Sequence, residues 1–280
     1  MKNNIERICN ALLYEGYALF PYRHNALKNQ KRFNFGVLSP KCWAEKQINE
    51  HFFQQIEILI LAEKDEQITF KTRFLKLNNN SEWQTANEKI IEGKFGLNKS
   101  KTIEYKEDTL FGKIKISSKQ LTENLFKIRL IFQNLSQILN PEKLLREEIL
   151  ACSFVSTHTI FSVENGKFLS QLEPPDRFIE QTKSLHNFGV FPVLIDDKLK
   201  QNNILASPII LYDFPEIAEK SFDNFFDGLE IDELMVLNLL ALTDEEKRQV
   251  AETDERTRRI LEKIESAKPE DLMKLHAHLR

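Results

Sequence analysis

Tyrosines, cationic side chains and a glutamate are crowded into one stretch near the N-terminus, residues 11–38. Arginine supplies a planar fork of donors that fits carboxylate and phosphate, and tyrosine supplies a stacking face. The same residues are also typical of a solvated loop, which we favour, because lysine and arginine are usually exposed. The candidates for binding an anion or a partner in this stretch are Glu15, Tyr17, Tyr22, Arg23, Lys28 and Arg32.

A second set of candidates lies later in the chain. His158 occupies an otherwise apolar, hydroxyl-bearing strand, where a hydroxyl or a carbonyl could fix its tautomer and allow acid–base chemistry. We favour a hydrogen-bonded core histidine, because no nucleophile or carboxylate pair is identifiable by spacing. Asp213 and Asp227 belong to the acidic, phenylalanine-rich stretch 212–234, which does not match an EF-hand loop. We interpret this stretch as a docking surface or a solvated loop.

Cysteine, histidine and glycine usage does not predict a metal or cofactor site. The three cysteines Cys9, Cys42 and Cys152 are odd in number and far apart, which fits neither a disulfide framework nor a zinc ribbon. His276 and His278 are two residues apart, so on a helix they face different sides. The 21 phenylalanines and only 8 glycines favour a dense aromatic core over glycine-rich phosphate loops. We therefore expect no metal and no cofactor.

Charge and hydropathy limit the classes of partner. Lysine and arginine total 39 against 42 acids, so the net charge of −3 gives no global footprint for nucleic acid, although a local basic patch remains open. No apolar run approaches the ~20 residues of a membrane helix, and the N-terminus lacks a long apolar segment with a cleavage site. We expect a cytoplasmic protein that does not bind membranes; nucleic-acid binding through the cations of residues 11–38 is a third, less favoured possibility, which predicts a salt-sensitive affinity.

The hydrophobic pattern indicates which elements position these residues. Residues 2–16 predict a short amphipathic helix, and residues 17–32 a proline turn followed by a cationic loop. From about 53 to 135 the period is two, with lysine alternating with isoleucine as in GKIKISS. This predicts at least five antiparallel strands with one solvated face, arranged as a β-sandwich or an open barrel.

Beyond residue 140 the pattern becomes mixed. Short helices alternate with strands, a hairpin is expected around Asn165-Gly166, and residues from about 216 onward predict helices. The fold class predicted is therefore α+β: an antiparallel β-sandwich-like region followed by a mixed α/β region with a C-terminal helical tail. The corresponding domains are residues 1–140 and 141–280, which could share one core.

Several stretches resemble a family of uncharacterised bacterial proteins associated with operons for nickel-iron hydrogenases of the actinobacterial type. They span nearly the whole chain and are LLYEGYALFPYRHNALKNQKRFNFGVL, STHTIFSVENGKFLSQLEPPD, GVFPVLI, SPIILYDFPEIA and FFDGLEIDELMVLNLLALTDEEKR. The resemblance implies an accessory or assembly factor. The cysteine clusters that would hold an iron–sulfur cluster are missing, so an electron-carrying subunit is not expected.

Two hypotheses of function follow. The leading one is a non-enzymatic bacterial accessory protein that acts through protein–protein interaction, because interaction-type residues are abundant and no catalytic constellation is recognisable. The alternative is an enzyme or small-ligand-binding protein with a pocket around Glu15, Tyr22, Arg23 and His158. Acid–base groups must reach the same substrate, so this pocket requires the four side chains to converge.

Overall fold

Two antiparallel β-sheets of five strands each dominate the computed structural model, which describes residues 2–14, 34–78, 85–196 and 198–215 and six positions between 243 and 262. The first sheet has the strand order β4 (Ser100–Glu107), β5 (Leu110–Gln120), β6 (Leu125–Asn134), β1 (Phe53–Ala62) and β8 (Gly166–Phe168). The second sheet has the order β3 (Thr85–Gly96), β2 (Gln67–Asn78), β7 (Val155–Val163), β10 (Asn203–Ser207) and β9 (Phe191–Leu194).

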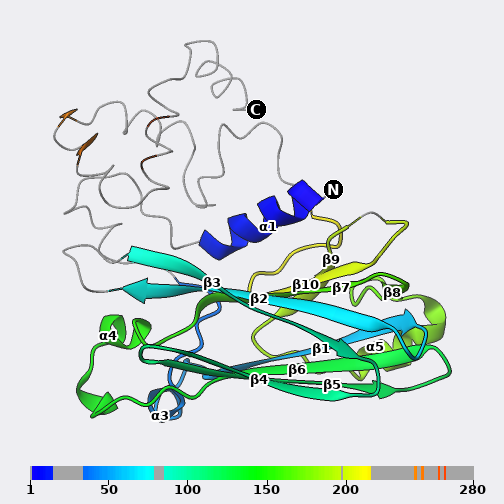
Figure 1. The fold of residues 1–280 in the computed structure, drawn as a ribbon, viewed down its shortest axis with the longest axis horizontal. Coiled ribbons are helices and arrows are strands. Elements are labelled where there is room, and N and C mark those ends of the chain that lie inside the picture. The colour runs from blue at the N-terminus through cyan, green and yellow to red at the C-terminus, as the bar shows by residue number, and fades with distance from the viewer. Residues whose placement is uncertain are drawn as a thin grey trace.

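The two sheets lie as two layers, one above the other (Figure 1). Alternate residues of each strand point into the space between the layers, as Ile114 and Ile116 do from β5 and Phe70 and Phe74 do from β2. Phe154 packs edge-on against Phe74 with ring centroids 4.8 Å apart. Each fully buried phenylalanine contributes about 1.5–3 kcal/mol to folding. The many phenylalanines therefore build the dense aromatic core expected from the composition.

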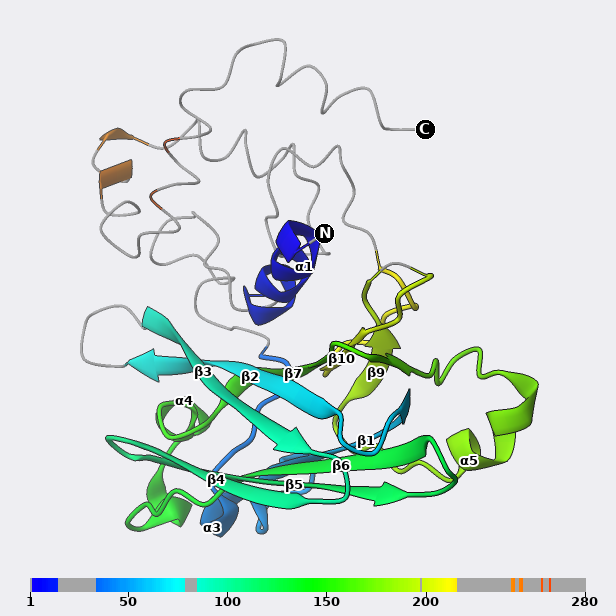
Figure 2. The same cartoon turned by 45° about the vertical axis from the view of Figure 1, so that its right-hand side comes forward.

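The described helices are short and lie outside the two layers. They are α1 (Lys2–Tyr14), α3 (Lys41–Ala44), α4 (Arg146–Leu150) and α5 (Ile179–Lys183), with single 3-10 turns η1 (Pro141–Lys143) and η2 (Asp176–Phe178). α1 crosses the outer face of the second sheet (Figures 1 and 2) and packs Ile8, Cys9 and Leu12 against Ile160 and Leu205. The amphipathic N-terminal helix predicted from the sequence is confirmed. Among the described residues, no helix is long and apolar enough to cross a membrane.

Strands from both halves of the chain share both sheets. β7 pairs with β2 in the second sheet, and β8 pairs with β1 in the first. The sequence predicted an α+β fold, and this is confirmed in part: the antiparallel strands are present, but the described residues form a mostly β fold with few helices. Residues 141–196 and 198–215 are less helical than predicted, because their strands all pair antiparallel and the helices described there have at most five residues. The predicted helical tail lies almost entirely outside the described residues.

Candidate functional site: polar clusters on the outer faces of the two sheets

The structure describes only part of the site predicted from the sequence. His158 and Asp213 belong to the described residues. The following predicted residues lie outside them: Glu15, Tyr17, Tyr22, Arg23, Lys28, Arg32 and Asp227. The convergence of Glu15, Tyr22 and Arg23 with His158 therefore stays a prediction.

The two described ends of the N-terminal stretch both lie beside the start of β7. Leu13, at the end of α1, packs in one apolar cluster with Val155. Where the chain is described again, the backbone N–H of Ser156 donates to the carbonyl of Phe35 at 2.9 Å. Both ends of the stretch thus lie beside the strand that carries His158, although about 120 to 140 residues separate that strand from them along the chain.

His158 is completely buried on the outer face of β7, directly opposite Arg73 of β2. Its Nδ1 lies 2.9 Å from the carbonyl oxygen of Ser156. A carbonyl only accepts, so Nδ1 carries the hydrogen and Nε2 holds a free lone pair. Burial lowers the pKa of His158 to about 4, with a smaller contribution from the nearby Arg73. The imidazole is therefore neutral at pH 7.

A β-bulge shapes the backbone next to His158. The pairing register of β2 and β7 shifts between Arg73 and Leu75, and Ser156 adopts a φ of 53°. A left-handed φ is strained for a residue with a side chain, and such strain persists where the surrounding structure holds it. Here the Phe35 carbonyl accepts from Ser156 N–H, and the Ser156 carbonyl orients the His158 ring. The bulge thus fixes the tautomer of the histidine.

Arg73 joins three elements beneath α1. Its side chain is only 3% exposed, and its Nε donates to Glu88 Oε1 of β3 at 2.7 Å. Its Nη2 donates to Asn10 Oδ1 of α1 at 2.5 Å, and its Nη1 lies 3.5 Å from Glu6 Oε2 of the same helix. We call this group, together with Cys9 and His158, the Arg73 cluster. Because one buried cation serves partners on both a helix and a strand, it holds α1 on the second sheet.

The thiol in the Arg73 cluster is not an activated nucleophile. Burial raises the pKa of Cys9 to about 12, and the nearby Arg73 opposes this only in part. Nucleophilic cysteines need a lowered pKa and a charged histidine or another cation close by. Cys9 is instead a protonated thiol, and His158 is a neutral imidazole. The cluster therefore lacks the thiolate–imidazolium pair of cysteine enzymes.

Asp213 is engaged by its own chain. Its Oδ1 accepts from the backbone N–H of Leu194 at 2.8 Å, at the end of β9. Its Oδ2 accepts from the hydroxyl of Ser170 in a short hydrogen bond. The Ser170 oxygen in turn accepts the backbone N–H groups of Leu172 and Glu173. Through these hydrogen bonds, Asp213 connects β9 to the turn after β8.

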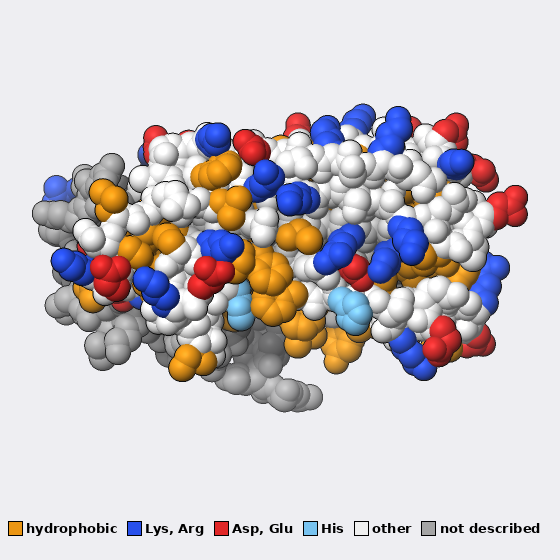
Figure 3. Space-filling model, turned by 90° about the horizontal axis from the view of Figure 1, so that it is seen from below, with side chains coloured by type: hydrophobic (Ala, Val, Ile, Leu, Met, Phe, Trp, Pro, Cys, Tyr) orange, Lys and Arg blue, Asp and Glu red, His pale blue; other side chains and the backbone are white. Residues whose placement is uncertain are grey.

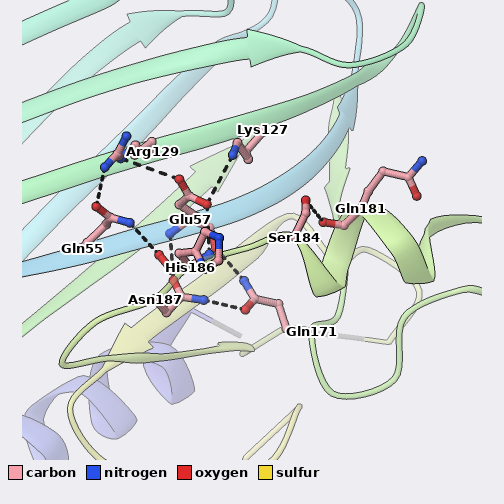
Figure 4. A network of polar contacts seen from close by, with 9 residues as sticks. All are labelled: Gln55, Glu57, Lys127, Arg129, Gln171, Gln181, Ser184, His186 and Asn187. Atoms are coloured by element: carbon pink, nitrogen blue, oxygen red, sulfur yellow. Dashed lines mark hydrogen bonds and ion pairs between the residues drawn. The ribbon is translucent and has the colours of Figure 1, made fainter.

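A second polar group, the Glu57 cluster, lies on the outer face of the first sheet (Figure 4). Glu57 of β1 has a side chain only 4% exposed and accepts the backbone N–H of His186 at 3.0 Å. On the neighbouring β6, Lys127 Nζ lies 3.3 Å from Glu57 Oε2, and Arg129 Nε lies 3.6 Å from Oε1. The buried carboxylate is thus paired and hydrogen-bonded, as a buried charge must be.

The Glu57 cluster fastens the loop of residues 184–188 to β1. Asn187 Oδ1 accepts the backbone N–H of Glu57 at 2.8 Å, and Gln55 Nε2 donates to the carbonyl of His186 at 2.8 Å. Gln55 Oε1 accepts from Arg129 Nη2 at 2.6 Å, which orients the arginine along the sheet (Figure 4). We call this segment the 184–188 loop. With the loop in place, the Arg129 side chain remains 49% exposed on the surface.

Cations gather on the same outer face of the first sheet. Because alternate residues share a face, the outward positions of β5 and β6 include five cations, which we call the lysine face: Lys113, Lys115, Lys119, Lys127 and Arg129. Figure 3, which views the molecule from this side, shows blue side chains grouped there. Lys119 is paired directly with Lys127 across the strands. Two like charges directly opposite each other destabilise a sheet.

Acidic side chains only partly balance the lysine face. Glu57 pairs with Lys127 and Arg129, and Glu104 of β4 lies 3.4 Å from Lys113 Nζ. Lys115 and Lys119 are exposed. The face therefore presents a positive surface on a chain whose net charge is −3. Such a surface attracts anionic groups and steers their approach.

The sequence contained a signal for the lysine face but none for the Glu57 cluster. The alternation of lysine with isoleucine in GKIKISS predicts a solvated strand face, yet each strand by itself shows only two or three charges. The cations of β5 and β6 become one surface through their pairing register. The contacts of Glu57 with His186 and Asn187 span about 130 residues of sequence, and no local pattern indicates them.

The sequence was compared with family models and with curated proteins. No family model matches the sequence, and no curated protein is significantly similar to it. The resemblance to hydrogenase-associated proteins therefore remains an expectation.

Proposed function

We propose that this protein is a bacterial accessory protein that binds a partner protein, and that the lysine face is its docking surface. The observation that carries the proposal is the gathering of five cations on one sheet face, with Lys119 directly opposite Lys127. The partner surface is accordingly acidic. Complementary charge increases the rate of association and fixes the orientation of the partner.

The cost of this arrangement supports a role in binding. A like-charge pair across two strands destabilises the sheet by roughly 0.2–1 kcal/mol. An alternation of signs on β5 and β6 would avoid that cost without disturbing the buried isoleucines on the opposite face. An acidic partner compensates the repulsion when it binds, because its carboxylates pair with the exposed Lys115 and Lys119.

The resemblance noted in the sequence suggests which partners to test first. It implies an accessory or assembly factor associated with nickel-iron hydrogenases. We therefore propose components of such an assembly, with acidic exposed surfaces, as the first partners for direct binding experiments.

The test compares charge variants in affinity capture. Tagged full-length protein recovers partners from a native bacterial lysate at low salt, and the double variant Lys115→Glu/Lys119→Glu is run beside it. Lys94→Glu on β3 is the control, since it reverses one exposed cation on the other sheet and so makes half the charge change of the double variant. We expect the acidic proteins recovered by the unmodified chain and by Lys94→Glu to be lost in the double variant. Equal recovery by all three proteins would refute the proposal.

A second candidate function is an enzyme or small-ligand protein whose pocket includes Glu15, Tyr22, Arg23 and His158. Its support is that His158 Nε2 is buried without a hydrogen-bond partner within the described part of the chain. Because Nε2 is an acceptor in the neutral tautomer, such a ligand would donate an N–H or O–H group. A small-molecule thermal-shift screen tests it: a ligand of this pocket raises the Tm of the unmodified protein but not that of His158→Asn.

A further inference from the structure

We infer that the segment bound by the lysine face combines acidic side chains with an aromatic or aliphatic anchor, which packs on the exposed ring of Phe188. This inference rests on the proposed function and specifies the chemistry of the partner. It is carried by an aromatic cluster at one end of the lysine face, formed by His51, Phe53 and Phe188, which we call the aromatic step.

The aromatic step is a packed group that still presents apolar surface. The rings of Phe53 and Phe188 stack with centroids 4.8 Å apart and planes 16° from parallel. His51 meets Phe188 edge-on, also at 4.8 Å. Phe188 nevertheless remains 37% exposed. Aromatic rings are enriched at protein interfaces and at their interaction hot spots.

The step is held rigidly before any partner binds. Phe188 forms two backbone hydrogen bonds with Gln55 of β1, at 3.0 and 2.9 Å. The residues before it are fixed by the Glu57 cluster, in which Glu57 accepts the backbone N–H of His186. Preorganised residues lose little conformational entropy on binding. Phe188 is thus prepared to receive an apolar side chain at low entropic cost.

The aromatic step and the lysine face form one surface. Phe53 and Gln55 are neighbouring outward positions of β1. Across the sheet, Gln55 is paired with Ile131 of β6, and Ile131 is paired with Lys115 of β5. Arg129 Nη2 reaches Gln55 Oε1 at 2.6 Å from the side of the cations. Figure 3 shows orange side chains beside blue ones on this side of the molecule. An anchor on Phe188 therefore places the rest of a bound segment over the cations.

The spacing of the cations favours an acidic protein segment. Successive outward residues of a strand are separated by about 7 Å, which is also the spacing of alternate side chains in an extended peptide. Nucleic-acid platforms need free aromatic faces on which bases stack. Phe53 and Phe188 stack on each other, so the open part of Phe188 offers one position for an anchor and not a row of faces for successive bases. We therefore assign the surface to an acidic peptide with an apolar anchor rather than to a nucleic acid.

The test measures peptide binding to the full-length protein by fluorescence anisotropy. The probe is a synthetic glutamate-rich peptide with a central phenylalanine, and a second probe carries serine in place of that phenylalanine. We expect the serine peptide to bind about tenfold more weakly, and Phe188→Ala to weaken the phenylalanine peptide by a similar factor. Tyr212→Ala, which removes an aromatic ring that is 86% exposed elsewhere, is the matched control and should bind normally.

The outcomes separate this inference from the proposed function. If both peptides bind equally and Phe188→Ala has no effect, the anchor is refuted while docking of acidic proteins stands. If Lys115→Glu/Lys119→Glu binds the phenylalanine peptide as tightly as the unmodified protein does, both ideas fail. Displacement of the peptide by a single-stranded oligonucleotide at equal or lower concentration would assign the surface to nucleic acid instead. The serine peptide keeps the test informative even if Phe188→Ala folds poorly.

Discussion

Replacing His158 by asparagine should flatten the dependence of stability on pH between about 6.5 and 4. Burial lowers the pKa of His158 from 6.5 to about 4. In that window the unfolded chain binds a proton that the folded protein does not bind. Stability from the neutral buried imidazole is therefore fully present above pH 6.5 and is lost as the pH falls toward 4. A shift of this size corresponds to about 3 kcal/mol, at ~1.4 kcal/mol per pKa unit.

Asparagine is chosen because its side-chain N–H can still donate to the carbonyl of Ser156, as Nδ1 of His158 does, but it does not titrate. Urea unfolding at pH steps from 7 to 4 gives the free energy of unfolding of each protein. The asparagine variant should be less stable at pH 7 because its smaller side chain leaves part of a buried space unfilled. The informative quantity is the slope with pH, so this loss does not affect the comparison.

His186→Asn is the control, since His186 is exposed and contacts Glu57 through its backbone N–H and not through its ring. It should keep the slope of the unmodified protein. If His158→Asn loses stability between pH 6.5 and 4.5 as steeply as the unmodified protein does, the inference of a buried neutral histidine is refuted.

Three further predictions follow from the charges and burial of particular residues. Lys119→Glu replaces the repulsion with Lys127 by attraction and should raise the Tm at low salt by about 1–4 °C, whereas Lys115→Glu, which is paired with an isoleucine, should change it little. Hydrogen bonds from Lys89 and Tyr105 lower the pKa of Glu107 to about 2, so the stability contributed by this carboxylate is present above pH 4.5 and is lost as the pH falls toward 2. Glu107→Gln should remove this part of the acid unfolding, which circular dichroism measures. The buried thiol of Cys9, with a pKa of about 12, should escape iodoacetamide at pH 8 until the protein is unfolded, as peptide mapping would show.

Each of these predictions has a contrary result. A lower Tm for Lys119→Glu at low salt would contradict the repulsion between the paired lysines. An unchanged acid transition in Glu107→Gln would show that this carboxylate is not stabilised in the folded state. Labelling of Cys9 in the native protein at the rate seen in urea would contradict its burial between α1 and the second sheet.

Local patterns in the sequence predicted the elements better than their arrangement. The alternation in GKIKISS and LFKIRLIF predicted antiparallel strands with one solvated face, and both segments are such strands, β5 and β6. The pairing of β2 with β7 could not be predicted in this way, because the two strands lie about 80 residues apart and either could pair with several others. The mixed α/β interpretation overestimated the helices of the described residues between 141 and 215 for the same reason. Short apolar segments there complete sheets that were begun before residue 140.

The sequence by itself determined which faces of the strands are apolar, that α1 is amphipathic, and that phenylalanine fills the core, since these follow from side-chain periodicity and composition. Only the tertiary structure showed that His158 is buried opposite Arg73, because the local sequence around a histidine in an apolar strand is the same whether the side chain is covered or open to solvent. It also decided that Lys119 faces Lys127. If the register between β5 and β6 shifted by one residue, the two lysines would lie on opposite faces of the sheet. Register is set by packing between strands, which the pattern of a single strand does not show.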